Sequence, residues 1–175
     1  MREFTPEEVL TYDPATGELR WKARPSNWFA EASEATRWNT RYAGRIAGTI
    51  DSKGHRQIRL NGRLEMAHRI AWRMSTGEWP KGEIDHERGN GDDNRLGNLR
   101  EVSHSRNCRN QKMRKTNTSG TMGVHQTKRG RWVARISTDD GRKHLGVFDN
   151  KEEAVAARRE AERKHEYHLN HGREE

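Results

Sequence analysis

The 175-residue sequence is poor in cysteine and in apolar residues, and each shortage excludes a class of protein. Its one cysteine, Cys108, cannot form an internal disulfide or a zinc site built on two or four cysteines. Only 30% of the residues are hydrophobic, so one large core is not expected. No run approaches the roughly 18 apolar residues of a membrane span, and the first residues lack the apolar segment of a secretory signal. We therefore expect a protein of the reducing cytoplasm with no membrane partner, in which nitrogen and oxygen atoms hold any metal.

Positive charge is abundant and unevenly placed. The net charge of +8 favours a polyanionic partner, and no basic amphipathic helix with a broad apolar face points to a membrane surface. From Lys112 to Lys143, nine Lys or Arg stand against two acids, so this stretch carries most of the net charge. Together with the polar segment 111–121, the asymmetry indicates a linker and a second, nucleic-acid-binding module that begins near Thr118.

Local patterns predict an α+β chain. Before the linker, short strands are predicted at 45–50, 55–60, 63–67, 83–86 and about 99–102. Asn61-Gly62 favours a two-residue hairpin, because both turn residues must adopt positive φ. Apolar residues at helical spacing predict a helix from about Ala67 to Ser75, ended by Gly77, and a second helix opened by Ser103 or Ser105.

The basic module reads as a meander and a helix. Strands are predicted at 122–126, 131–138 and 143–148, with turns at Arg129-Gly130 and Asp140-Gly141. A helix from about Lys151 to His165 follows, with Asp149 and Glu152 as a capping box. The first 45 residues show little periodicity.

Asp85 and His86 stand side by side at the end of a predicted strand. Strand neighbours face opposite sides, so both serve one site only where the strand ends or bulges, which the glycines at 89 and 91 allow. Asp85 and Asn107 would then offer oxygen ligands to a Mg²⁺-like ion, while His86 accepts a proton, as phosphodiester hydrolysis requires. A polar turn that satisfies its own backbone is an equally open interpretation. A calcium loop is a third, although the acid spacing of an EF-hand is missing.

The segment "AHRIAWRMSTGEWPKGEIDHERGNGDDNRLGNLREVSHSRNCRN" resembles the HNH endonuclease family, specifically the phage and intron-encoded homing endonucleases of the ββα-metal class. The resemblance implies that Asp85 is a metal ligand, that His86 is the general base and that Asn98 braces the loop. Asn107 stands where many relatives carry a histidine and would be the second metal ligand. One divalent ion is implied, Mg²⁺ or alternatively Mn²⁺, and Asp92 and Asp93 are then expected to shape the turn.

The segment from Ser119 to His168 resembles an AP2 DNA-binding domain, a three-stranded sheet backed by a helix whose sheet enters the major groove. The resemblance implies DNA contacts by His125, Thr127, Arg129, Arg131, Arg135, Ser137, Arg142 and His144. It also implies packing of sheet against helix by Gly123, Trp132, Leu145, Gly146 and Phe148.

Other residues have simpler expected roles. His68 is expected to be buried and hydrogen-bonded, and Trp72 and Trp79 to lie in the core. Arg69 or Arg100 is a candidate contact to the scissile phosphate.

These inferences predict a metal-dependent homing endonuclease that nicks double-stranded DNA as a monomer, without a small-molecule cofactor. The alternative is a sequence-specific DNA-binding regulator with an inert HNH module. The predicted segments are an N-terminal region of unclear role at 1–45, the HNH domain at 46–111, a basic linker at 112–118, the AP2-like domain at 119–168 and a tail at 169–175. The motif "LTYDPATGELRW" resembles the opening of such endonucleases.

Overall fold

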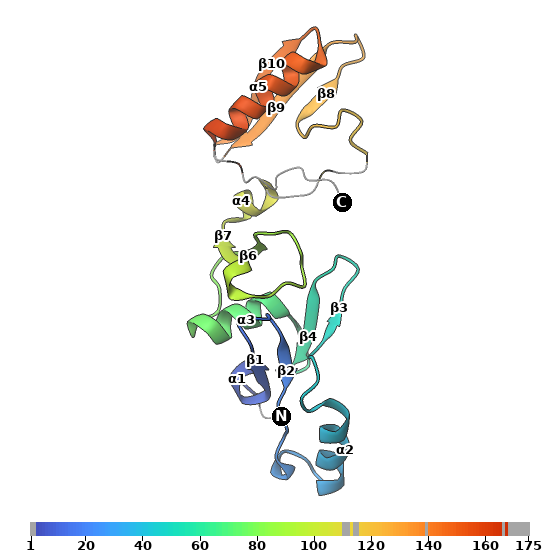
Figure 1. Ribbon diagram of the computed structural model, residues 1–175, viewed down its shortest axis with the longest axis vertical. Coiled ribbons are helices and arrows are strands. Elements are labelled where there is room, and N and C mark those ends of the chain that lie inside the picture. Colours follow the sequence, from blue (N-terminus) through green and yellow to red (C-terminus); the bar gives the residue numbers. More distant parts are fainter. Residues whose placement is uncertain (1–2, 110–112, 114–115, 139, 166, 168–175) are drawn as a thin grey trace. The chain divides into compact units, whose positions relative to one another are not determined.

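The computed structural model describes residues 3–109, 113, 116–138, 140–165 and 167, which form two compact units (Figure 1). The first unit is Met1–Val102 and the second is Ser103–Glu175. Both combine helices with small antiparallel sheets, so the predicted α+β class is confirmed. Residues 112, 114 and 115 of the predicted basic linker and all of the predicted tail lie outside the described residues. Within the described part, no helix has the length and apolar character needed to cross a membrane.

The first unit holds three small sheets, two longer helices and several short helical turns. Its helical elements are α1 Pro6–Val9, η1 Ser26–Trp28, α2 Ala32–Tyr42, α3 Ala67–Thr76 and η2 Leu96–Asn98. Its strands are β1 Leu10–Tyr12, β2 Leu19–Trp21, β3 Thr49–Ile50, β4 Arg56–Leu60, β5 Arg63–Met66, β6 Glu83–His86 and β7 Leu99–Val102. β1 pairs with β2, β6 with β7, and β3, β4 and β5 form one sheet in that order.

The predicted turn and helix boundary of this unit follow from backbone conformation. Asn61 and Gly62 adopt φ values of 51° and 78°, as a two-residue hairpin between β4 and β5 requires. Gly77 closes α3 in the left-handed region at φ 84°, where its missing Cβ avoids strain. The predicted strands 83–86 and 99–102 are also confirmed.

One core joins the N-terminal region to the rest of the first unit. Its buried residues are Val9, Leu10, Leu19, Ala47, Ile58, Leu60, Ala67, Ile70, Ala71, Ile84 and Leu99. Each large aliphatic side chain buried there contributes about 1.5–3 kcal/mol. Trp72 packs against this core as predicted, but Trp79 is 40% exposed, so its predicted place in the core is wrong. Trp79 lies beyond the end of α3, where the apolar face of the helix no longer directs its side chain inward.

The second unit places one helix on a three-stranded meander. Its elements are α4 His104–Arg109, β8 Val124–Gln126, β9 Trp132–Thr138, β10 Gly141–Phe148 and α5 Lys151–Lys164, with strand order β10-β9-β8. Val124, Ala134 and Ala154 form the centre of its core. Trp132, Leu145 and Phe148 pack around them, which confirms their predicted role.

The N-terminus of α5 differs from its prediction by one residue. Asn150 is the N-cap, and its Oδ1 accepts a hydrogen bond from the Glu153 backbone N–H at 2.9 Å. Asp149 instead forms an ion pair with Arg131 at 2.9 Å. The expected capping box of Asp149 and Glu152 is therefore wrong, because the helix is capped one residue later, by an asparagine that accepts from the Glu153 N–H.

Candidate active site

Asp85 and His86 end strand β6 and are both buried, with 8% and 5% of their surface exposed. The chain turns immediately after His86, where the Gly89 N–H donates to the His86 carbonyl at 2.8 Å. Gly89 has φ 75°, a conformation that favours glycine. The strand end therefore allows two neighbouring side chains to be buried in one region, as the sequence pattern predicts.

The carboxylate of Asp85 is held by Arg100 on the facing strand β7. The two residues are direct cross-strand partners, and Arg100 Nε and Nη2 both donate to Asp85 Oδ2, at 2.9 and 2.7 Å. A charged pair buried to this degree stays favourable only while each charge has a partner. Arg100 is therefore a partner of the buried Asp85 carboxylate, and its predicted contact to phosphate stays a prediction.

The imidazole of His86 is oriented by Asn94, which lies in the loop after β6. His86 Nε2 lies 3.3 Å from Asn94 Oδ1, and the Asn94 side chain also donates to the Asp92 carbonyl at 3.2 Å. Because an amide oxygen only accepts, His86 Nε2 carries the hydrogen and Nδ1 carries the lone pair. Burial lowers the pKa of His86, while the bond to Asn94 opposes this shift. The ring is therefore neutral near pH 7, the state that a general base needs.

Two further histidines surround the ring of His86. Ring centroids of His68 and His86 are 5.0 Å apart in an edge-to-face arrangement, and His55 lies 5.7 Å from His86 and 5.9 Å from His68. Burial and the nearby histidines lower the pKa of His68 to about 3. His68 is buried as predicted, but its Nδ1 has no hydrogen-bond partner among the described residues, so the expected hydrogen bonding is not found at that atom.

Asn98 ties both ends of the loop 87–98 together from a fully buried position. Its Oδ1 accepts from the Arg88 backbone N–H at 2.9 Å, and its Nδ2 donates to the Asp93 carbonyl at 2.8 Å. This confirms that Asn98 braces the loop. Asp92 and Asp93 have the predicted shaping role, because their carboxylates pair with Arg56 at 2.8 Å and Arg95 at 2.5 Å.

The N-terminal motif "LTYDPATGELRW" contacts this same loop. The Tyr12 hydroxyl donates to the Asn94 carbonyl at 2.8 Å. Gly17, at φ 78°, lies against the backbone of Asn94 and Arg95. A Cβ at Gly17 would come within 2.5 Å of the Arg95 backbone nitrogen. The motif therefore supports the residue that orients His86, a role that its short pattern did not reveal.

Asn107 lies on α4 in the second unit, apart in sequence from Asp85 and His86. α4 begins after Ser103, whose hydroxyl accepts from the Arg106 backbone N–H at 3.3 Å, in agreement with the predicted serine cap. The joint binding of one ion by Asp85 and Asn107 stays a prediction. No cluster of three or more His, Cys, Asp or Glu side chains suited to a metal occurs in the described ranges. Arg69 donates to the carbonyls of Gly82 and Pro80 at 3.2 and 3.3 Å, which gives it a structural role.

Several predicted DNA contacts share one face of the second unit. The register pairs Arg142 with Ser137 and His144 with Arg135, and directly paired side chains point to the same side of a sheet. These four residues are exposed, whereas Ala134 and Ile136, which alternate with Arg135 and Ser137 along β9, are buried. The exposed side chain of His125, opposite Val133, belongs to the same face.

The remaining predicted contacts lie in the turn between β8 and β9 and not on strands. Arg129 and Arg131 are exposed there, and Arg131 is engaged with Asp149. The hydroxyl of Thr127 is buried without a hydrogen-bond partner among the described residues. The side chain of Thr127 is thus the least accessible of the eight.

Sequence reasoning did not identify His55, Asn94 or Tyr12 as parts of the site. Each is brought to His86 by packing and not by a local spacing. Gly91 was one available signal, because a Cβ there would come within 2.8 Å of the His55 ring and of the Gly54 carbonyl. Gly91 therefore marks the point where the loop approaches Gly54 and His55, just before β4.

Comparison with known proteins gives one match, which covers the region of this site. Residues 65–109 match a family model described as HNH endonuclease. No curated protein and no solved structure matches the chain. The matched residues run from β5 through α3, β6, the loop and β7 to the end of α4, and thus include Asp85, His86, Asn98 and Asn107.

Proposed function

We propose that this chain is a metal-dependent DNA endonuclease of the homing type that nicks one strand as a monomer. The HNH endonuclease match at residues 65–109 supports nuclease activity on DNA. The observation that carries the finer proposal is the buried Asp85–His86 pair at the end of β6, with His86 oriented by Asn94 and its loop braced by Asn98. We assign the nuclease to residues 46–111 and DNA recognition to residues 119–168.

His86 acts as the general base in this proposal. Its Nε2–H is directed to Asn94, so Nδ1 takes the proton from the attacking water. Asn94 keeps the ring in one tautomer and orientation, because it accepts from Nε2 and is itself held by the Asp92 carbonyl. A correctly oriented base accelerates such a step by about 10²–10⁴-fold.

Asp85 and Asn107 are the proposed ligands of one divalent metal ion, Mg²⁺ or Mn²⁺. A carboxylate and an amide oxygen are hard donors of the type that Mg²⁺ takes, and two protein ligands leave room for water and phosphate oxygens. When bound, the ion offsets charge on the scissile phosphate and the leaving oxygen. The Asp85 carboxylate is buried and already pairs with one cation, because Arg100 lies 2.7 Å from its Oδ2.

The second unit supplies the proposed recognition surface. Arg135 and Arg142 lie with Ser137 and His144 on the sheet face opposite the buried Ala134. A ribbon of two or three strands fits the major groove, and arginine forms bidentate hydrogen bonds to guanine. The resemblance to AP2 domains and the exposed, basic face support this assignment.

A plasmid-nicking assay tests the function. Supercoiled plasmid that carries a genomic target is incubated with the full chain and Mg²⁺ or Mn²⁺, beside a His86→Ala variant and an EDTA control. We expect open circles with the wild type and at least about 10²-fold slower nicking with His86→Ala. A wild type that shifts the plasmid on a gel yet leaves it intact with every metal would identify the regulator with an inert HNH module instead.

A further inference from the structure

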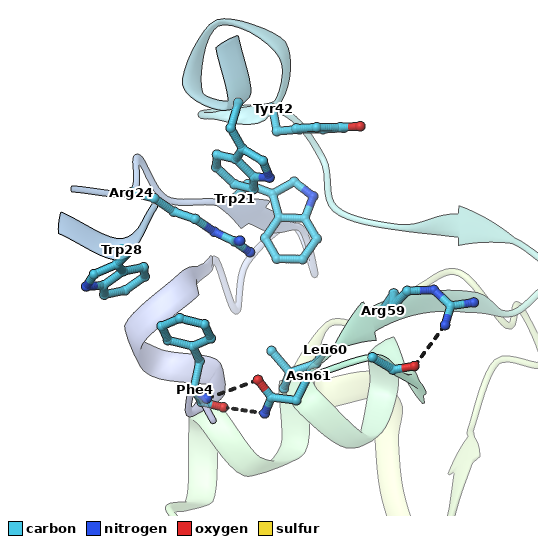
Figure 2. A pocket seen from close by; sticks show the side chains of 10 residues that line it. Phe4, Trp21, Arg24, Trp28, Tyr42, Arg59, Leu60 and Asn61 are labelled. Atoms are coloured by element: carbon cyan, nitrogen blue, oxygen red, sulfur yellow. Dashed lines mark hydrogen bonds between the residues drawn. The ribbon is translucent and has the colours of Figure 1, made fainter. Parts of the chain in front are cut away.

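A pocket lined by aromatic side chains lies in the first unit, outside the candidate active site (Figure 2). Its volume is about 620 Å³, within the range of about 300–1,000 Å³ that is usual for ligand sites. Five of the twelve aromatic residues of the chain line it, namely Phe4, Trp21, Trp28, Trp38 and Tyr42. Such a concentration in one hollow of a chain that is only 7% aromatic needs an explanation beyond chance.

Packing of the core accounts for only some of these rings: among the described residues Phe4, Trp21 and Trp28 pack against it, whereas Trp38 and Tyr42 do not belong to that cluster. α2 carries Ala35, Trp38 and Tyr42 on one face, but among them only Ala35 is buried. Tyr42 is 36% exposed, and Trp21, Trp28 and Trp38 keep intermediate exposure. Partly exposed aromatic rings gathered in one place are typical of a binding site.

The rings and one guanidinium form a layered arrangement. Phe4 and Trp28 lie 4.5 Å apart, and Trp21 and Trp38 lie 5.9 Å apart edge to face. The Arg24 guanidinium is 3.9 Å from the centre of the Trp38 ring, and Figure 2 shows it between Trp28 and Trp21. The same guanidinium lies 5.5 Å from the centre of the Trp21 ring and 5.8 Å from that of Phe4, so three aromatic rings pack around one cation.

This arrangement is held in place before any ligand arrives. The Asn39 side chain accepts a hydrogen bond from the backbone N–H of Arg24 at 2.8 Å and donates one to the backbone carbonyl of Arg24 at 2.9 Å. The Asn61 side chain binds the Phe4 backbone in the same two-way manner, at 3.0 and 2.8 Å. A preorganised pocket loses less free energy on binding than one that must first be ordered.

The charges of the pocket favour an anionic ligand. Arg24 and the exposed Arg59 both line it, and none of its ten described lining residues is acidic. The Nε–H of Arg24 is buried without a hydrogen-bond partner in the described part of the chain, so an unused donor is present. A nucleotide unites a planar aromatic group with a negative charge in one unit, and it is the unit of the proposed DNA substrate.

We propose that this pocket binds an unpaired nucleobase of a DNA strand, stacked against its rings and the Arg24 guanidinium, with the adjoining phosphate next to Arg59. The inference rests on the proposal that DNA is the substrate, and it places a second DNA contact on the first unit. Its function is to hold a base that leaves the duplex, because paired bases are stacked on one another and cannot enter a pocket.

Binding to two single strands of equal charge tests the inference. The full chain in EDTA is titrated with labelled oligothymidylate of about eight nucleotides and with a strand of the same length that lacks all bases. The basic surface contributes equally to both, since both carry the same phosphates. We expect oligothymidylate to bind at least about tenfold more tightly and to quench tryptophan fluorescence. Equal affinity for the two strands would overturn the inference.

Variants test whether a preference for strands that carry bases arises at this pocket. Trp38→Ala and Tyr42→Ala should each reduce the preference for bases, and Trp38→Phe should retain much of it because a ring remains. Trp79→Ala is the control, because Trp79 is an exposed tryptophan of the same unit outside the pocket. Thermal unfolding checks that each variant is folded. A base preference that all folded variants retain would also overturn the inference.

The nicking assay on the same preparations separates the two proposals. Nicking without base-dependent binding would refute only the proposal that the pocket binds a base. Base-dependent binding without nicking would refute only the proposal that the chain is a nuclease.

Discussion

Arg100 holds Asp85 across the β6–β7 pair with two hydrogen bonds that end on the same oxygen, Oδ2, at 2.9 and 2.7 Å. In our proposal the guanidinium and the metal ion share this carboxylate. Removing one partner of a buried ion pair is strongly destabilising, so Arg100 should stabilise the buried Asp85 carboxylate in the metal-free protein.

Loss of Arg100 should make the stability of the protein depend more strongly on metal. In EDTA, Arg100→Gln should lower the free energy of unfolding by about 1–3 kcal/mol, because Asp85 loses two hydrogen bonds from a charged donor. Added Mg²⁺ should restore stability more in this variant than in the wild type. Thermal unfolding with and without Mg²⁺ measures both effects. Arg56→Gln, which breaks the ion pair with Asp92, is the matched control and should gain nothing extra from Mg²⁺. An equal response of the two variants would contradict the sharing of Asp85.

Asn98→Ala should weaken the loop and slow nicking together. The variant leaves the Arg88 N–H and the Asp93 carbonyl without these two partly buried bonds, at a cost of about 1–3 kcal/mol. Urea unfolding measures the loss. Asn98→Asp is an informative partner, because a carboxylate still accepts from Arg88 but cannot donate to Asp93. Wild-type stability of Asn98→Ala would show that the loop is held by other contacts.

The N-terminal motif should influence catalysis through Asn94. Gly17→Ala places a Cβ against Arg95 at a φ of 78°, so it should displace the Asn94–Arg95 segment and cost about 1–2 kcal/mol or more. Tyr12→Phe removes only the hydroxyl that donates to Asn94 and should slow nicking with a smaller loss of stability. Nicking rates and melting temperatures, compared with Thr11→Ala in the same strand, separate positioning from folding. Unchanged nicking by both motif variants would argue against this support.

Stability should fall in acid because of His68. Burial lowers its pKa from 6.5 to about 3, so between these values the unfolded chain binds a proton that the folded chain excludes. The free energy of unfolding that comes from keeping His68 neutral is therefore fully present above pH 6.5. It is lost as the pH decreases toward 3. At about pH 5 the loss from His68 alone should be about 2 kcal/mol. Urea unfolding across this range measures the slope, which His68→Phe should make shallower. An identical slope in that variant would show that other groups dominate.

The exposed sheet face of the second unit should account for part of the salt dependence of DNA binding. Arg135→Ala and Arg142→Ala should each weaken binding and lower the dependence of log affinity on log salt by about one. Arg159→Ala, an exposed arginine on α5, is the control and should change affinity little. Fluorescence anisotropy at several salt concentrations measures the slopes. A larger effect from Arg159 would place the DNA on the helix side.

The sequence by itself determined the local elements and the order of the motif residues. The β4–β5 turn follows from Asn61 and Gly62, because only residues that tolerate positive φ form it. α3 and the β6–β7 pair follow from periodicity and short-range spacing. The places of Asp85, His86, Asn98 and Asn107 follow from one linear pattern, which the HNH endonuclease match spans.

Tertiary structure alone decided which distant residues surround and orient the ring of His86. His55, His68 and Asn94 come from different elements, and Tyr12 reaches Asn94 across 82 residues of sequence. The aromatic pocket likewise gathers Phe4, Trp28 and Trp38 from three segments without a shared period. The physical reason is that a spacing rule describes neighbours along one helix or strand, whereas these contacts depend on how separate elements bury their apolar faces in one core.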